Sequence, residues 1–122
     1  MSCTILLVED DAHNIELLAA MLEGNGCDIV SCYTPSDALS VLSSRHINLI
    51  VTDICLPQMN GVQFAEQVRA MPEYTNVPMI AISAVAEPDL IQGMRRVGCN
   101  AIFSKPLSVR DLRGAVQASL SA

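Results

Sequence analysis

Residues 4–11 read Thr4-Ile-Leu-Leu-Val-Glu-Asp-Asp11, a short apolar run that ends abruptly in three acidic residues. A strand that is apolar on both faces indicates a parallel sheet with helices on both sides. Similar runs at 47–52 and 78–82 end at Asp53 and Ser83. The three runs therefore predict a sheet with polar side chains along its carboxyl-end edge, which is where open α/β sheets bind their ligands.

Helical spacing and turn residues fill the intervals between the strands. Apolar residues recur at helical spacing from Ile15 to Leu22, and Thr34 followed by Pro35 is typical of a helix start. Five strands alternating with five helices predict one α/β domain over 1–122, with a five-stranded parallel sheet in a three-layer sandwich. In chain order, the expected elements are strand 4–8, a helix that carries Ile15–Leu22 and stops at Gly24, strand 28–33, helix 35–45, strand 47–52, helix 62–71, strand 78–82, helix 88–97, strand 101–103 and a helix that Ser108 caps and that runs to about Leu120.

The composition narrows the class of protein. The net charge is −6 over 122 residues, and the seven basic residues include a single lysine, Lys105. Binding to nucleic acid needs clustered Lys and Arg, so a direct nucleic-acid partner is not expected. The apolar runs are too short to span a membrane and no signal peptide is visible, so we expect a cytoplasmic protein.

Five cysteines stand at positions 3, 27, 32, 55 and 99, an odd number without a Cys-x-x-Cys pair. Their spacing supports neither a disulfide framework nor a zinc site. We therefore expect free, mostly buried thiols that pack as small apolar side chains in a reducing compartment.

The polar strand ends define a candidate site. They contribute Glu9, Asp10, Asp53 and Ser83, and Lys105 lies just after the fifth strand. Clustered carboxylates repel one another, and a divalent cation with oxygen ligands, such as Mg²⁺, relieves that repulsion. An aspartate can attack a phosphoryl group, a lysine can neutralise phosphate oxygens, and a serine hydroxyl can donate a hydrogen bond to them. The site therefore predicts phosphoryl-transfer chemistry.

Four sequence elements occur in a fixed order, Ile5-Leu-Leu-Val-Glu-Asp10, Asp53-Ile-Cys-Leu-Pro-Gln-Met-Asn-Gly61, Ser83-Ala84 and Lys105-Pro106. Together they resemble the receiver domain of two-component response regulators, the CheY-like fold, over essentially the whole chain. The resemblance implies that Asp53 accepts a phosphoryl group from a sensor histidine kinase or a histidine phosphotransfer protein, with Mg²⁺ as cofactor. It further implies Mg²⁺ ligands at Glu9, Asp10, Asp53 and the backbone carbonyl of Cys55, a switch hydroxyl at Ser83, a phosphate partner at Lys105 and a cis peptide bond before Pro106.

Two positions depart from the pattern of that family. Ile102, three residues before Lys105, stands where the family has Tyr or Phe, and the adjacent Phe103 faces the other side of a strand. The switch would therefore work with a smaller, aliphatic side chain. Cys55 and Val85 are poorly suited to orient an attacking water, so we expect slow self-dephosphorylation.

The resemblance implies a signalling switch rather than an enzyme that turns over a separate substrate. Phosphorylation would shift the segment 83–87 and the helix after it. The output face would consist of the fourth helix, the fifth strand and the fifth helix, with a downstream protein as its partner and a homodimer on phosphorylation as a further expectation. The chain leaves no room for an output domain, which fits a stand-alone regulator and equally a receiver from a longer protein.

Three alternatives stay open. A degenerate receiver would act as a docking module without phosphorylation. A haloacid-dehalogenase-like phosphatase carries Asp-x-Asp after its first strand, and a flavodoxin-like electron carrier carries a phosphate loop rich in glycine and hydroxyl groups there. The segment Glu9-Asp10-Asp11 matches neither of these two patterns, and we interpret Asp11 itself as a surface residue.

Overall fold

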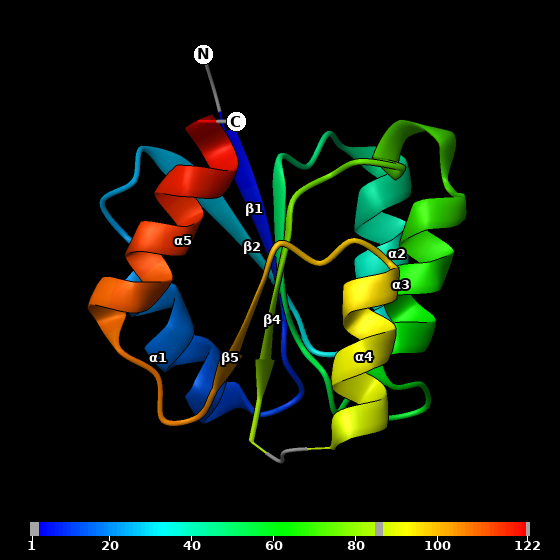
Figure 1. Ribbon diagram of the computed structural model, residues 1–122. Helices are drawn as coiled ribbons and strands as arrows, with labels where there is room; N and C mark the ends of the chain where they lie inside the picture. The colour runs from blue at the N-terminus through cyan, green and yellow to red at the C-terminus, as the bar shows by residue number, and fades with distance from the viewer. Residues whose placement is uncertain (1–2, 85–86, 122) are drawn as a thin grey trace.

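The computed structural model describes residues 3–84 and 87–121, in which strands form a sheet between two layers of helices (Figure 1). The strands are β1 (Cys3–Val8), β2 (Cys27–Cys32), β3 (Leu49–Asp53), β4 (Met79–Ser83) and β5 (Ala101–Ser104). The helices are α1 (Ala12–Leu22), α2 (Pro35–Ser44), α3 (Gly61–Ala70), α4 (Pro88–Arg96) and α5 (Val109–Ser121), with a short 3₁₀ helix η1 (Pro72–Tyr74). None of the helices in the described ranges has the length and apolar character needed to cross a membrane.

The sheet is parallel throughout, with the strand order β2-β1-β3-β4-β5. Figure 1 shows α1 and α5 on one face and α2, α3 and α4 on the other. The predicted three-layer (βα)5 sandwich is therefore confirmed. The strand order reverses between β1 and β3, and ligands bind outside the carboxyl ends of the strands at such a reversal.

Side-chain caps fix where several helices begin. Thr34 Oγ1 and Ser108 Oγ each accept a hydrogen bond from the backbone N–H three residues later, as their positions predict. Asn60 and Gln63 form a capping box, in which each side chain accepts a hydrogen bond from the backbone N–H of the other residue. This box starts α3 at Gly61, one residue earlier than the sequence predicts.

Several strand boundaries differ from the predicted ones by one or two residues. β2 covers 27–32 rather than 28–33, and β3 begins at Leu49 rather than at 47. Asn48 accepts the hydrogen bond from the Thr4 N–H through its side-chain carbonyl at 2.8 Å, and the regular pairing of β3 with β1 begins at the next residue, Leu49. The short helix η1 was not predicted from the sequence, and its last residue, Tyr74, is buried in the core.

The sheet divides an aliphatic core into two clusters. The cluster on the α2–α4 side contains Phe64 and the partly buried Ile102. The cluster on the α1 and α5 side contains Leu112 and the partly buried Phe103. Ile102 and Phe103 thus face opposite sides of β5, as the alternation of a strand predicts.

The cysteine prediction is wrong in two respects. Cys3 and Cys27 are joined by a disulfide bond, with their Cα atoms 4.5 Å apart. They are register partners on the neighbouring strands β1 and β2, an alignment that the sequence spacing does not reveal. Of the three free cysteines, Cys32 is buried, Cys99 is half-buried and Cys55 is exposed, so the free thiols are not mostly buried.

Candidate functional site at the carboxyl edge of the sheet

The carboxyl ends of the two central strands bring acidic side chains together. Asp53 is the last residue of β3, and Glu9 directly follows β1, whose final residue pairs with Thr52. Glu9 is 1% exposed and Asp53 is 7% exposed, whereas Asp10 is open to solvent. Carboxylate oxygens of Glu9, Asp10 and Asp53 all lie within 4.8 Å of one another. The site therefore holds three carboxylates, two of them buried.

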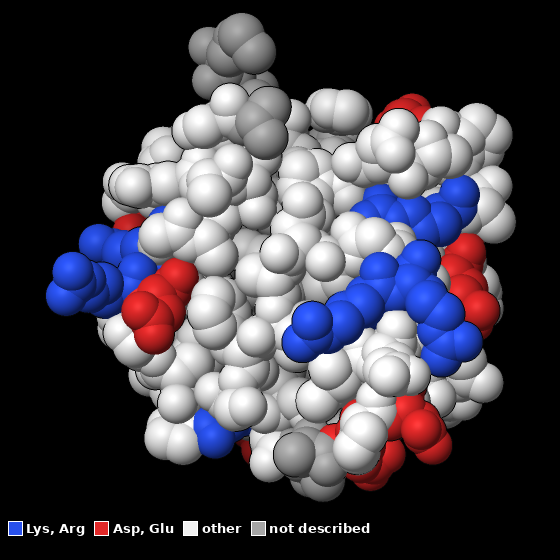
Figure 2. Space-filling model, in the orientation of Figure 1, with Lys and Arg blue, Asp and Glu red and all other residues white. Residues whose placement is uncertain are grey.

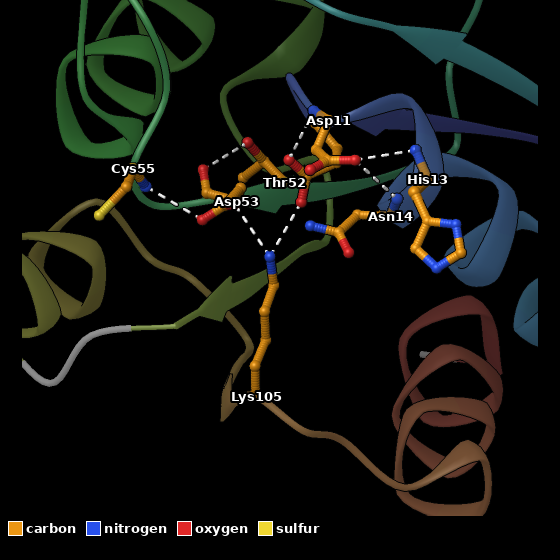
Figure 3. Close-up of polar contacts among 8 residues, drawn as sticks. Asp11, His13, Asn14, Thr52, Asp53, Cys55 and Lys105 are labelled. Atoms are coloured by element: carbon orange, nitrogen blue, oxygen red, sulfur yellow. Dashed lines mark hydrogen bonds and ion pairs between the residues drawn. The ribbon is translucent and has the colours of Figure 1, made fainter.

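Lys105 supplies the positive charge that these buried carboxylates require. Its Nζ donates to Glu9 Oε1 at 2.9 Å and to Asp53 Oδ2 at 3.2 Å, and the lysine side chain reaches the site from below in Figure 3. The Lys105 backbone N–H donates to the Ser83 carbonyl at 2.9 Å, which ties the lysine to the end of β4. Buried carboxylates are tolerated when they are paired and hydrogen-bonded, as both are here.

Further donors hold the two buried carboxylates in place. The Cys55 N–H donates to Asp53 Oδ1 at 3.0 Å, so each oxygen of this carboxylate has a donor (Figure 3). Thr52 Oγ1 donates to the Asp53 carbonyl oxygen at 3.0 Å. Glu9 Oε2 accepts a hydrogen bond from the Asp11 N–H at 3.1 Å. Hydrogen bonds to a charged acceptor are strong, so both carboxylates are fixed in orientation before any ligand arrives.

Burial, hydrogen bonds and neighbouring charges shift the pKa values of three side chains at the site. A side-chain hydrogen bond with Glu9, together with partial burial, raises the pKa of Asp10 above its ordinary value of 3.8. Burial acts to lower the pKa of Lys105, but the hydrogen bond to Glu9 and the charge of Asp53 outweigh it and raise this pKa above 10.5. Desolvation and the charge of Asp53 raise the pKa of the Cys55 thiol above 9.0. At neutral pH the lysine is therefore charged and the thiol is protonated.

The donor set of the site suits a hard divalent cation. Mg²⁺ prefers carboxylate oxygens and keeps several waters, and the exposed Asp10 beside the buried Glu9 and Asp53 offers both. The three carboxylates also lie close enough to repel one another when they are charged, and a bound cation relieves such repulsion. The acidic cluster is therefore compatible with Mg²⁺.

The remaining predicted residues lie around this cluster. Ser83 is the last residue of β4 and is 5% exposed, and the residue before it, Ile82, pairs with Asp53. The peptide bond between Lys105 and Pro106 is cis, as predicted. The structure thus places the expected serine and lysine on the strands and loops that adjoin Asp53.

Three predicted roles stay predictions. Ile102 lies on β5, where it pairs with Ala81 of β4 and packs against the core on the α2–α4 side. Cys55 directs its N–H to Asp53, while the use of its carbonyl as a metal ligand remains an expectation. Val85 lies outside the described residues.

Sequence reasoning missed two contributors to the site. Asp11 is exposed as predicted, but it is also the N-cap of α1, because its Oδ1 accepts from the N–H groups of His13 at 2.8 Å and Asn14 at 3.3 Å (Figure 3). An aspartate just before a helical apolar pattern is a signal for such a cap. Thr52 gave no signal, since a threonine within an apolar strand is ordinary.

The fold and the site together define a parallel α/β domain with carboxylates after its central strands and a lysine after its last one. The response regulator receiver domain family matches residues 5–117. The chain therefore belongs to the response regulator receiver domains, the phosphorylation-controlled switch modules of two-component signalling.

Relatives with known sequences and structures agree with this assignment. The polar-differentiation response regulator DivK of Brucella ovis is 30% identical over 109 residues, which is 89% of each chain. An uncharacterized 14.6 kDa protein of Leptolyngbya boryana is 34% identical over 113 residues, 93% of this chain and 86% of that protein.

Solved structures share the fold at lower identity. The CheY-like receiver domain protein of Methanospirillum hungatei has a TM-score of 0.91 at 24% identity, over 99% of this chain and 95% of that chain. The signal receiver domain of an HD domain-containing protein of Pseudomonas fluorescens has a TM-score of 0.93 at 23% identity, over 99% and 96% of the two chains. These likenesses establish the common fold.

Proposed function

We propose that this chain is a phosphorylatable receiver whose phosphoacceptor is Asp53. The observation that carries the proposal is the Asp53 carboxylate itself, which is buried, held by the Cys55 N–H and the Lys105 ammonium, and adjoined by two further carboxylates. A buried aspartate with a fixed orientation is a nucleophile that is already oriented for attack.

In the proposed reaction, an Asp53 carboxylate oxygen attacks the phosphorus of a phosphohistidine or a small acyl phosphate. A bond forms between that oxygen and phosphorus, the bond to the donor's nitrogen or oxygen breaks, and the electron pair leaves with the donor. Lys105 neutralises charge on the transferred group as its contact with the carboxylate loosens. Glu9, Asp10, Asp53 and the Cys55 carbonyl would hold Mg²⁺, which supplies positive charge to the phosphoryl oxygens when it is bound.

The new phosphoryl group would be sensed by Ser83 and Lys105. The Ser83 hydroxyl can donate to a phosphoryl oxygen, and the Lys105 backbone is already bonded to the Ser83 carbonyl. A movement of Ser83 toward the phosphoryl group would leave space that Ile102 fills. The charge of the phosphoryl group would thereby change the position of the segment after β4 and of the helix that follows it.

The proposed output face consists of α4, β5 and α5. Figure 2 shows this face, with positive side chains over α4, positive and negative side chains next to each other over α5, and an uncharged stretch between them over β5. We expect a downstream protein, and a second copy of the chain after phosphorylation, as partners here. The donor would be a sensor histidine kinase or a histidine phosphotransfer protein in the cytoplasm, and residues 1–122 would act as one receiver unit that catalyses only its own phosphoryl transfer.

The decisive experiment is intact mass spectrometry after incubation with acetyl phosphate, with and without Mg²⁺, on the wild type and on Asp53→Asn. We expect a gain of one phosphoryl group that requires Mg²⁺ and is absent from the variant. A folded Asp111→Asn variant, changed on the exposed side of α5, serves as the matched control and should gain the group normally. A wild type that stays unmodified while folded would instead support a docking module that works without phosphorylation.

A further inference from the structure

Arg69, in the last turn of α3, donates hydrogen bonds to four backbone carbonyls through its one guanidinium group. Its Nε donates to the Val97 carbonyl at 2.7 Å and its Nη2 to the Gly98 carbonyl at 3.2 Å, both just beyond the C-terminal end of α4. Its Nη1 donates to the carbonyl of Tyr74, the last residue of η1, at 3.1 Å and to that of Val77, just before β4, at 2.7 Å. Arg69 therefore ties the end of α4 to α3 and to the entrance of β4.

The packing of α4 is concentrated in the same half of the helix. Gly93 and Met94 are its buried residues, and a Cβ atom on Gly93 would lie 2.9 Å from a Val62 methyl group, so α4 approaches α3 closely at this point. At the other end, Glu87 makes no side-chain capping hydrogen bond and residues 88–89 are exposed. The helix is thus fastened mainly through its C-terminal half, while its N-terminal half contributes the partly buried Leu90 to the core.

We infer that Arg69 is a positioning residue of the switch, which fixes the C-terminal end of α4 so that the helix tilts about this point. Hydrogen bonds from a planar guanidinium are directional, whereas apolar packing tolerates small sliding movements. A cation at a helix C-terminus is also favoured by the helix dipole. A change that starts near Ser83 would therefore move mainly the N-terminal half of α4.

The inference deepens the proposed function and rests on it, because phosphorylation of Asp53 is the event that would act on Ser83. Its consequence is specific to the output face. The part of this face that changes would be the N-terminal half of α4, while the end next to β5 would keep its position in both states.

Arg113 offers a matched control on the other side of the sheet. Its Nε donates to the Met21 carbonyl at 2.9 Å and its Nη2 to the Glu23 carbonyl at 2.7 Å, at the C-terminal end of α1. This arginine also holds a helix end through backbone carbonyls, but the helices that it joins are α5 and α1. Replacing Arg113 therefore also removes hydrogen bonds from a guanidinium group to a helix end, but it leaves the contacts of α4 unchanged.

The test is hydrogen exchange by mass spectrometry on peptides that cover 87–91 and 92–99, with and without acetyl phosphate and Mg²⁺. The proteins are the wild type, Arg69→Gln, Arg69→Lys and Arg113→Gln. In the unphosphorylated Arg69→Gln variant, we expect the amides of 97–99 to exchange about tenfold faster, since lost hydrogen bonds favour local opening. Arg113→Gln should leave both peptides at the wild-type rate.

Phosphorylation supplies the second comparison. In the wild type and in Arg113→Gln, exchange should change over 87–91 and stay constant over 92–99, whereas in Arg69→Gln the change should extend through 92–99. Arg69→Lys, which keeps the charge but not the planar fork of donors, should fall between these patterns. It also carries the test if Arg69→Gln does not fold.

Two results would overturn the inference. One is a wild-type response that is uniform along α4, and the other is an Arg69→Gln variant whose 97–99 amides exchange at the wild-type rate. A wild type that takes up no phosphoryl group would refute the proposed function separately, because the unphosphorylated comparison still decides whether Arg69 holds the end of α4.

Discussion

Lys105 and Asp53 are separated by 52 positions in the chain, yet the lysine Nζ lies 3.2 Å from Asp53 Oδ2. The same ammonium is 2.9 Å from Glu9 Oε1. One cation therefore balances two buried carboxylates that lie at the carboxyl ends of different strands. The site is held together by this shared charge before any phosphoryl group or metal ion is bound.

Replacement of the shared cation should destabilise the fold. In Lys105→Met, Glu9 and Asp53 lose their charged partner while they stay buried, and the free energy of unfolding should fall by about 1–3 kcal/mol. Urea unfolding measures this difference. Arg110→Met, an exposed residue of α5, is the control and should change stability by less than about 0.5 kcal/mol. Equal losses in the two variants would contradict the role assigned to Lys105.

The same pairing predicts how stability depends on alkaline pH. The pKa of Lys105 is raised above 10.5 in the folded state, so its stabilising contribution is fully present below pH 10.5 and is lost as pH rises through the folded-state pKa. The wild type should therefore lose its advantage over Lys105→Met as pH rises above 10.5. Urea unfolding of both proteins across this range measures the difference between their free energies of unfolding. The titration of cysteines and tyrosines affects both proteins equally and cancels in this difference. A difference that stays constant to the highest pH would exclude the coupling.

The apolar runs of β1, β3 and β4 were enough to predict the sheet, because these central strands are buried on both faces and each is followed abruptly by polar residues or ends in one. The convergence of Asp53 and Lys105 followed from the topology of a parallel sheet. The disulfide between Cys3 and Cys27 did not, because it depends on the register of β1 against β2. The bonds of Arg69 were equally invisible, since backbone carbonyls leave no mark in a sequence.

Asp10 should be a residue whose charge weakens the metal-free fold. Its pKa is raised, so above that pKa the ionised carboxylate carries an energetic penalty, which solvent exposure keeps small. In the absence of divalent cations, Asp10→Asn should raise Tm slightly, on the order of 1–2 °C. Mg²⁺ at roughly 100 times its Kd should stabilise the wild type by about 2.7 kcal/mol and the variant by much less.

Asp11→Asn is the matched control for this prediction. Asparagine caps a helix as well as aspartate does, so the cap of α1 survives and the neighbouring negative charge is removed. Differential scanning calorimetry with and without Mg²⁺ should give this variant a metal response close to that of the wild type. A full response in Asp10→Asn would rule out Asp10 as part of the metal site.

The disulfide predicts a defined number of reactive thiols. After unfolding in denaturant, the oxidised chain should take up three maleimide groups, on Cys32, Cys55 and Cys99, and the reduced chain should take up five. The bond closes a loop that contains α1, so reduction should lower the free energy of unfolding by about 3 kcal/mol. Cys27→Ser should lose this response to reductant, whereas Cys55→Ser should keep it. Five adducts on the protein before reduction would show that the thiols are free.

Cys55 should make the phosphorylated state long-lived. Its side chain follows Asp53 by two residues, and its thiol, with a raised pKa, stays protonated and is a weak hydrogen-bond partner for water. We expect the phosphorylated wild type to persist well beyond seconds after the donor is removed, as measured by intact mass over time. Cys55→Asn, whose amide can bind and orient a water, should shorten the half-life by about tenfold or more. Cys55→Ala has a smaller side chain without a polar group, so it distinguishes blocked access of water from poor orientation of water. A half-life as short as that of Cys55→Asn would mean that the thiol only blocks access. A half-life like that of the wild type would mean that orientation of the water limits the rate.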